Sequence, residues 1–99
     1  MTNMEKYISL AKLCTHYKLE MPFFAQLNES GLIELKVQNE EYFLHEEQVL
    51  SLEKIIHLHV DLEINVEGIE TILHLLEKIE VLQREAIVLK NRLRLYEEE

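Results

Sequence analysis

The last third of the chain carries the most regular pattern of apolar and polar positions. Between residues 72 and 96, an apolar side chain recurs every three and then four positions, and no glycine or proline interrupts the run. This spacing places the apolar side chains along one stripe of a helix, and a stripe of this length is typical of a helix that pairs with another helix. The predicted dimer seam consists of Ile72, Leu75, Ile79, Leu82, Ala86, Leu89, Leu93 and Tyr96.

The same segment carries more apolar residues than one seam requires. A second face is therefore available, either for packing on the rest of the same chain or for forming a small bundle. Glu85 and Lys90 flank the seam, where opposite charges can pair across a parallel dimer, although exposed pairs contribute little. The pattern leaves the parallel and antiparallel arrangements open. The additional apolar residues are Leu73, Leu76, Val81, Ile87, Val88 and Leu95.

Two short helices joined by a tight turn are predicted near the N-terminus. Ser9 is suited to cap a first helix over residues 9–17, whose apolar positions share one face. Pro22 fits the first turn of a second helix over residues 22–30, because the missing N–H is not needed there. Gly31 follows that helix, where a left-handed backbone favours a residue without Cβ. This order of elements predicts a helix-turn-helix.

A hairpin and two further helices complete the predicted fold. Residues 33–44 alternate apolar and polar side chains around a polar turn, which indicates two strands. A third helix is expected over residues 46–60, and Asn65 is suited to cap the last helix after a short linker. We therefore predict a mainly α fold with a small β-hairpin wing: a winged helix-turn-helix over residues 1–64, followed by a long coiled-coil-type dimerisation helix over residues 65–99.

The charge of the chain narrows its possible partners. Its 10 basic and 19 acidic residues give a formal net charge of −9. The second predicted helix is also poor in cations, because no lysine or arginine occurs between Lys18 and Lys36. Affinity for nucleic acid comes largely from neutralising phosphates, so DNA binding is disfavoured, although a regulator that binds DNA as a dimer stays as the alternative. A basic protein partner is favoured.

The order of elements resembles the MerR superfamily of bacterial regulators, as does Gly31-Leu32-Ile33 after the second helix. The run from Asp61 to Ile69, with the pattern D-L-x-I-N-x-E-G, resembles the chaperone-modulator CbpM family more specifically. The chain departs from DNA-binding MerR proteins in the second helix, where Ala25-Gln26-Leu27 stands in place of an Arg-Tyr-Tyr-type sequence. The resemblance implies that the chain is MerR-like in fold and that its relatives have exchanged DNA for a protein partner.

The CbpM resemblance implies a non-enzymatic protein that binds and inhibits a J-domain co-chaperone such as CbpA. A J-domain uses a basic helix to engage its chaperone, so an acidic and apolar surface of this chain would mask that helix. Charge and expected exposure suggest two groups of contact residues. They are Glu63, Glu67 and Glu70 around the start of the last helix, and Glu40 and Glu41 on the wing. Glutamates at a helix start also simply suit the helix dipole.

Other kinds of site find little support in the sequence. His57 and His59 are two residues apart and point to different sides of a helix, and Cys14 is expected to be a small core residue. No phosphate loop or nucleophile motif occurs, so we expect no enzyme activity, metal, cofactor or small-molecule ligand. No long apolar run or secretory signal is visible, so no membrane contact and a cytoplasmic location are expected. A structural or adaptor dimer with another partner is a third possibility.

Overall fold

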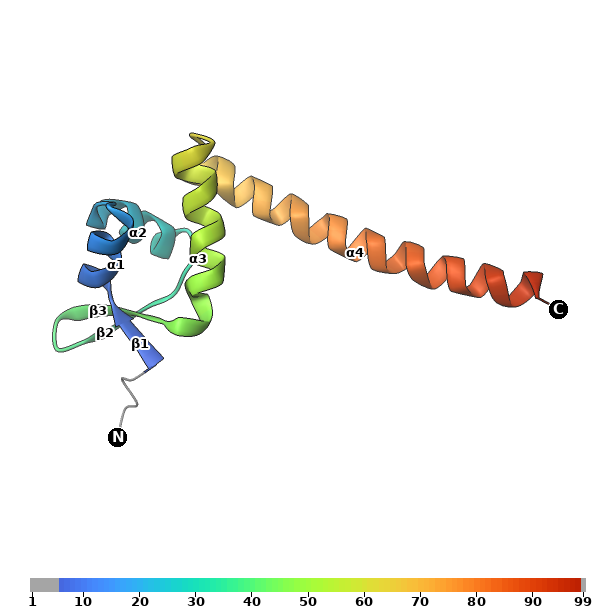
Figure 1. Ribbon diagram of the computed structural model, residues 1–99, viewed down its shortest axis with the longest axis horizontal. Coiled ribbons are helices and arrows are strands. Elements are labelled where there is room, and N and C mark those ends of the chain that lie inside the picture. Colours follow the sequence, from blue (N-terminus) through green and yellow to red (C-terminus); the bar gives the residue numbers. More distant parts are fainter. Residues whose placement is uncertain (1–5, 99) are drawn as a thin grey trace. The chain divides into compact units, whose positions relative to one another are not determined.

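The computed structural model describes residues 6–98 of the chain. The parts of the two predicted domains at residues 1–5 and 99 lie outside the described residues. The chain divides into two compact units, one that extends to Ile69 and one that begins at Glu70. Within the described residues, the first unit holds three short strands, two short helices, a third helical element made of consecutive segments and the first turn of the long C-terminal helix, and the second unit holds the rest of that helix (Figure 1). The predicted fold class, mainly helical with a small antiparallel sheet, is confirmed.

The first helix, α1, spans Leu10–Tyr17 and begins as the sequence predicts. The Ser9 side chain accepts a hydrogen bond from the Lys12 N–H at 3.2 Å, which satisfies one of the free donors at the helix start. The helix ends at Lys18, whose φ of +57° places it in the left-handed region. Leu19 N–H then bonds the Cys14 carbonyl at 3.1 Å, which turns the chain toward α2.

The second helix, α2, spans Met21–Glu29, one residue earlier at each end than expected. Pro22 lies in its first turn, and Gly31 follows with a φ of +78°. Gly31 thus adopts the left-handed conformation that the sequence suggested for this position. Asn28, near the end of α2, accepts a hydrogen bond from Leu35 N–H at 3.0 Å and fastens the next strand to the helix.

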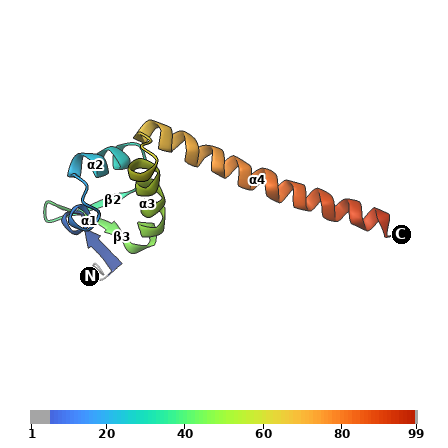
Figure 2. The ribbon, with the colours of Figure 1, turned by 45° about the horizontal axis from the view of Figure 1, so that its top comes forward.

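The sheet has three antiparallel strands in the order β1-β3-β2. Strand β2 spans Leu35–Gln38 and strand β3 spans Glu41–His45, which together form the predicted wing. A third strand, β1, was not predicted from the sequence; it spans Tyr7–Ser9 and pairs with β3 so that Tyr7 faces His45. The sheet is therefore one strand wider than the two-stranded hairpin that was predicted. Figure 1 and Figure 2 show β1 leading directly into α1.

The helix expected over residues 46–60 consists of three consecutive segments. A 3₁₀ turn, η2, covers Glu46–Gln48, the α-helix α3 covers Val49–Ile56, and a π-helical segment, η3, covers His57–Asp61. Gln48 fixes the start of this element, because its side-chain amide accepts from Glu34 N–H at 2.8 Å and donates to the Glu34 carbonyl at 2.9 Å. Tyr17 of α1 donates its hydroxyl proton to Glu53 of α3 at 3.1 Å.

The core of the first unit takes apolar side chains from α1, α2, β3 and α3. The first turn of the long helix α4, which spans Val66–Glu97, contributes two of them. The compact unit therefore includes the beginning of α4 and does not stop at the linker. Side chains from all three helices and the sheet close around one another and exclude water, which is the main source of stability for a fold of this size. The buried residues are Leu10, Leu13, Phe24, Leu27, Ile33, Leu44, Leu52, Ile55, Val66 and Ile69.

Candidate partner-binding surfaces

The five glutamates expected to meet a partner lie on separate parts of the structure. Glu40 and Glu41 are exposed at the turn between β2 and β3. Glu63 is exposed in the linker before α4, and Glu67 and Glu70 are exposed on the first turns of α4. Figure 1 shows the hairpin turn and the linker at opposite ends of the first unit. The wing and linker glutamates are therefore two separate candidate surfaces.

The linker holds a defined conformation because its backbone is bonded to η3. Ile64 N–H bonds the Leu58 carbonyl at 3.0 Å, and His59 Nδ1 lies 2.9 Å from the Ile64 carbonyl. The His59 ring also stacks on Phe23 of α2, with ring centroids 4.4 Å apart. Glu63 has a φ of +55°, a left-handed conformation that costs a residue with a Cβ on the order of 1 kcal/mol. The surrounding bonds hold Glu63 in this strained position.

Two residues of the D-L-x-I-N-x-E-G pattern have clear structural roles. Asn65 Oδ1 accepts a hydrogen bond from Gly68 N–H at 2.8 Å, so Asn65 caps α4. A Cβ on Gly68 would lie 2.7 Å from Ile64 Cγ2, closer than real Cβ atoms approach, and 3.0 Å from Asn65 Oδ1, which is a tight contact. The close return of the linker therefore favours glycine at position 68, because any larger residue would have to displace Ile64. The motif encodes how the chain enters α4.

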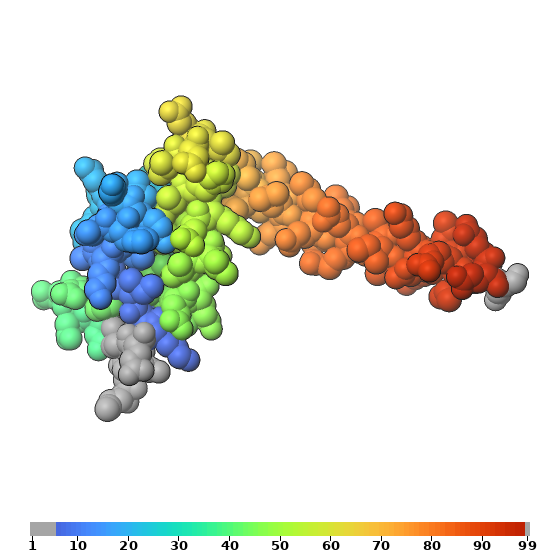
Figure 3. Space-filling view, in the orientation of Figure 1, coloured from blue at the N-terminus to red at the C-terminus, as the bar shows by residue number. Residues whose placement is uncertain are grey.

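The end of η3 and the linker after it also carry exposed apolar side chains, which the charge pattern did not indicate. Val60 and Leu62 are 50% and 55% exposed, and they alternate with Asp61 and Glu63. In Figure 3 the linker atoms, coloured yellow, project from the first unit. An apolar pair between carboxylates is a surface suited to a partner that is itself apolar and basic. The predicted bounds put Val60 at the end of the third helix and Leu62 in the linker, so the shared exposure of these two residues was not expected.

The wing offers a smaller surface of the same kind. Val37 and Tyr42 form a cross-strand pair and are 58% and 44% exposed. Asn39 and Glu40 make the two-residue turn with φ values of +52° and +63°, the left-handed conformations that such hairpins require. Lys36, the one cation of the wing, places its Nζ 5.1 Å from the centre of the Tyr7 ring. The turn is therefore acidic, and the lysine of β2 packs on an aromatic ring of β1.

The exposed face of α2 lacks the groups that DNA recognition uses. Met21, Ala25, Gln26 and Glu29 are exposed along this helix, whose residues are all described. None of these side chains carries a positive charge, so none neutralises a phosphate or makes the two-bonded contact of arginine with guanine. The helix-turn-helix keeps the shape of a DNA-binding element without its electrostatics.

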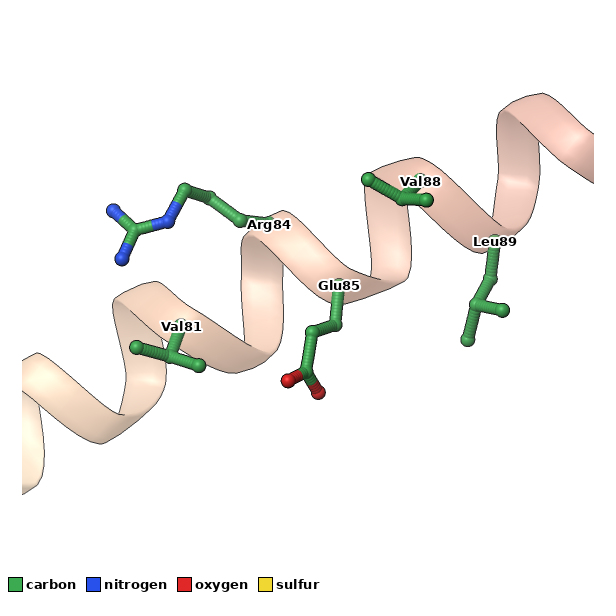
Figure 4. A pocket seen from close by; sticks show the side chains of 5 residues that line it. All are labelled: Val81, Arg84, Glu85, Val88 and Leu89. Atoms are coloured by element: carbon green, nitrogen blue, oxygen red, sulfur yellow. The ribbon is translucent and has the colours of Figure 1, made fainter.

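The second unit is a helix whose apolar side chains face water. Ile72 is half-buried, and the other predicted seam residues are exposed, as are Val81, Ile87, Val88 and Leu95. Two shallow hollows on this helix are lined by its own residues, one by Val81, Arg84, Glu85, Val88 and Leu89 (Figure 4). Residues of a single helix at such spacings form the spaces that receive side chains of a second helix.

Reactive groups are sparse in the described part of the chain. Residues 6–98 contain no cluster of three side chains able to hold a metal ion, and no helix there is long and apolar enough to cross a membrane. His57 Nδ1 and Asp61 Oδ2 form an exposed pair at 2.6 Å within η3. Cys14 is half-buried on α1, and partial burial raises the pKa of its thiol. A raised pKa lowers the thiolate fraction, and with it the reactivity.

Comparison with known proteins gives consistent relatives. A model described as MerR HTH family regulatory protein matches residues 8–91. Two proteins named Chaperone modulatory protein CbpM, from Pseudomonas entomophila (strain L48) and Pseudomonas putida (strain W619), are each 28% identical over 87 residues. These matches cover 87% of this chain and 86% of each relative. No solved structure matches the chain.

Proposed function

The chain belongs to the MerR HTH family of regulatory proteins, and we propose that it acts as a chaperone modulator that binds and inhibits a J-domain co-chaperone. The observation that carries this proposal is the exposed face of α2, which holds no cation in a chain of net charge −9. The names of the relatives supply the direction, because both are modulators of chaperones and neither name is that of an enzyme.

The proposed contact is the linker surface, defined here as Val60, Leu62, Glu63 and Glu67. Its exposed apolar pair can meet the apolar face of a partner helix, and the exposed Glu63 beside this pair can meet a lysine or arginine next to that face. A J-domain engages its chaperone through a basic helix. A protein that covers this helix prevents the chaperone from using it, so inhibition needs no chemical step. Glu70 continues the acidic surface along α4.

The wing surface, Val37, Glu40, Glu41 and Tyr42, is the second candidate contact. We rank the wing surface below the linker surface because the conformation of the linker surface is held by more interactions. Glu40 lies in the two-residue turn and Glu41 begins β3. The turn geometry largely fixes the backbone conformation of Glu40. The linker surface is held by hydrogen bonds to η3 and by the stacked pair of His59 and Phe23. A preorganised surface loses less entropy when it binds.

A titration of the full chain with a purified J-domain tests the proposal. We expect binding that weakens as salt rises, because exposed charges are screened, and we expect loss of J-domain-stimulated ATPase activity of the partner chaperone. Replacing Glu63 and Glu67 together with lysine should weaken binding at least tenfold, an expected loss of about 1.4 kcal/mol. Absence of binding, or binding that is indifferent to salt, would contradict the electrostatic mechanism.

Two matched variants separate position from net charge. Glu40→Lys with Glu41→Lys changes the charge of the wing by the same amount as the linker variant. Glu77→Lys with Glu98→Lys makes the same change on an exposed residue of α4 and on the exposed residue that follows this helix. We expect the α4 pair to leave the affinity within about twofold at 0.15 M salt, where distant charges are screened. If the wing variant has the largest effect, the contact lies on the wing.

We also propose that two copies pair through α4. The seam residues are exposed in the single chain, and a helix that presents this much apolar surface to water favours association. Sedimentation equilibrium should give twice the monomer mass. Leu82→Lys and Leu89→Lys should each shift the protein toward monomer, because each places a charge in the seam.

DNA binding is the alternative function, and the helix-turn-helix itself favours it. An electrophoretic shift with nonspecific duplex at low salt is the direct test. We expect no shifted band, because none of the exposed lysines in the described part of the first unit lies on α2. A tight, sequence-selective complex at 0.15 M salt would favour the regulator over the chaperone modulator.

A further inference from the structure

Charge is distributed unevenly along the first unit. Residues 6–19, which include β1 and α1, contain three lysines and no acidic residue. Residues 20–69 contain two lysines and eleven acidic residues. A surface built from residues 6–19 therefore carries positive charge in a chain whose net charge is −9, and it attracts a different kind of partner from the rest of the unit.

A groove between α1 and α3 lies beside this positive segment. Its volume of about 490 Å³ is within the range of binding clefts. Ile8 of β1, Leu13 of α1 and Val49 of α3 line it with apolar side chains that are buried or half-buried. Figure 1 shows the two helices leaving the same sheet, α1 directly after β1 and α3 after β3. Leu50, the next residue of α3, is 75% exposed, so apolar surface continues on α3 beside the groove.

Tyr17 lines the groove and fixes its shape. Its hydroxyl donates to Glu53 of α3 at 3.1 Å, which joins the two helices. Its ring lies edge-on to the ring of His16, with centroids 4.7 Å apart. The groove is therefore already formed in the single chain, and a preformed site loses less entropy when it is occupied.

The polar side chains along the groove all come from α1. Lys12, Thr15 and His16 line it and are exposed, and no acidic side chain is among its described lining residues. Lys18 is exposed just after α1. On the α3 side, the carboxylate of Glu53 already accepts a tyrosine hydroxyl. An occupant that places carboxylates over α1 is therefore attracted, and an occupant that places lysines there is repelled.

We propose that the α1–α3 groove binds an amphipathic helix of a second protein, whose apolar stripe is flanked by aspartate or glutamate. A helix suits the groove because side chains at i, i+3 and i+4 form a continuous apolar stripe that inserts between two helices. The carboxylates beside this stripe then face Lys12. The linker surface requires a basic partner, so the two surfaces select partners of opposite charge and do not compete for the same one.

NMR of the full chain with labelled methyl groups tests the proposal. The methyl groups of Ile8, Leu13 and Val49 report on the groove, and those of Val60 and Leu62 report on the linker surface. The probe is a synthetic helical peptide of about 18 residues, or five turns, with leucine along one stripe, glutamate on both sides of it and alanine elsewhere. The matched control peptide has lysine in place of every glutamate. We expect the glutamate peptide to shift the three groove residues saturably, and the lysine peptide to leave them unshifted.

Three variants of exposed residues check the position of the site. Lys12→Glu should weaken binding of the glutamate peptide about fivefold or more at low salt, because it replaces an attraction with a repulsion. Lys54→Glu makes the same change of charge on α3 outside the groove, and it should leave the affinity within about twofold at 0.15 M salt. Thr15→Trp should fill the groove and abolish the shifts, with an unchanged circular dichroism spectrum because Thr15 is exposed. Equal losses from Lys12→Glu and Lys54→Glu would overturn the groove as the contact.

Two further outcomes would also overturn the proposal. One is a glutamate peptide that leaves the three groove residues unshifted. The other is a set of groove shifts caused by phosphatidylglycerol vesicles or single-stranded DNA and not by the glutamate peptide. The J-domain titration concerns the linker surface, so a negative result there contradicts the chaperone proposal and leaves the groove assignment in place.

Discussion

Replacing Gly68 with alanine tests whether the linker and the first turn of α4 pack as tightly as the structure shows. Alanine is favoured over glycine inside a helix by up to about 1 kcal/mol, so propensity alone predicts a stabilised protein. The new Cβ would lie 2.7 Å from Ile64 Cγ2, against an optimum of about 3.5–4.0 Å for two carbon atoms. It would also lie 3.0 Å from Asn65 Oδ1, the atom that caps the helix.

The steric cost exceeds the gain in propensity. Overpacking of this kind typically costs about 1–3 kcal/mol, and displacing the Asn65 cap costs about 1 kcal/mol. Against a gain of up to about 1 kcal/mol, we expect Gly68→Ala to lower the free energy of unfolding by roughly 1–3 kcal/mol. Urea denaturation followed by circular dichroism, at one fixed protein concentration, measures this change.

A double-mutant cycle identifies the cause of the loss. Ile64→Ala removes the Cγ2 atom and, by itself, destabilises the protein because Ile64 is half-buried. If the clash with Ile64 is responsible, Gly68→Ala should cost at least about 0.5 kcal/mol less in the Ile64→Ala chain than in the wild type. A Gly68→Ala chain as stable as the wild type, or more stable, would refute the close packing of the linker.

Three further predictions concern the first unit. Glu40→Gly should stabilise the protein by about 0.5–1 kcal/mol in urea denaturation, because it relieves a left-handed φ of +63° next to Asn39, whereas Glu41→Gly should not. Desolvation and the nearby Glu53 raise the pKa of Tyr17. Because the folded state favours the protonated hydroxyl of Tyr17, this group contributes stability that is complete below the ordinary tyrosine pKa and is lost as pH rises through the raised value. Tyr17→Phe should therefore reduce the loss of stability at alkaline pH. An unchanged profile of stability against pH would contradict this expectation. Cys14 should react with an alkylating reagent more slowly in the native chain than in urea, as mass spectrometry would show, and equal rates would exclude its protection.

Local rules were enough to predict the ends of the helices. The hydroxyl of Ser9 and the amide of Asn65 each cap a helix three residues before the N–H that they bind. Gly31 adopts a positive φ after α2. In all three cases the interacting groups are close in sequence, so the chemistry of a few residues determines the conformation.

Non-local pairing could not be predicted in the same way. Strand β1 has three residues, too few for a recognisable alternation of apolar and polar side chains. Ile8 in this strand pairs with Leu44 of β3, which lies 36 positions later in the sequence. The π-helical end of the third helix, η3, could not be predicted either, because the sequence of these residues is typical of an ordinary α-helix. Its conformation is accompanied by a hydrogen bond from Ile64 N–H to the Leu58 carbonyl, which forms only in the folded chain. Both features depend on contacts that form only when the chain has folded.

The candidate surfaces were predicted in part. Charge alone drew attention to the glutamates of the linker and the wing, and all of them are exposed. The charge pattern did not predict that Val60 and Leu62 are exposed beside these carboxylates. The hydropathy of a residue does not show whether its apolar side chain is exposed or buried. The MerR-like family and the resemblance to CbpM proteins were recognised from the sequence, and the comparisons confirm both.

The contribution of Val66 and Ile69 to the core has a consequence for biosynthesis. A ribosome makes β1 first, yet that strand has no edge to join until β3 has emerged. The core then stays open until the first turn of α4 has also been made. A nascent chain therefore exposes Phe24, Leu27 and Leu52 to the cell until translation has passed residue 69, and its folding is completed late rather than step by step.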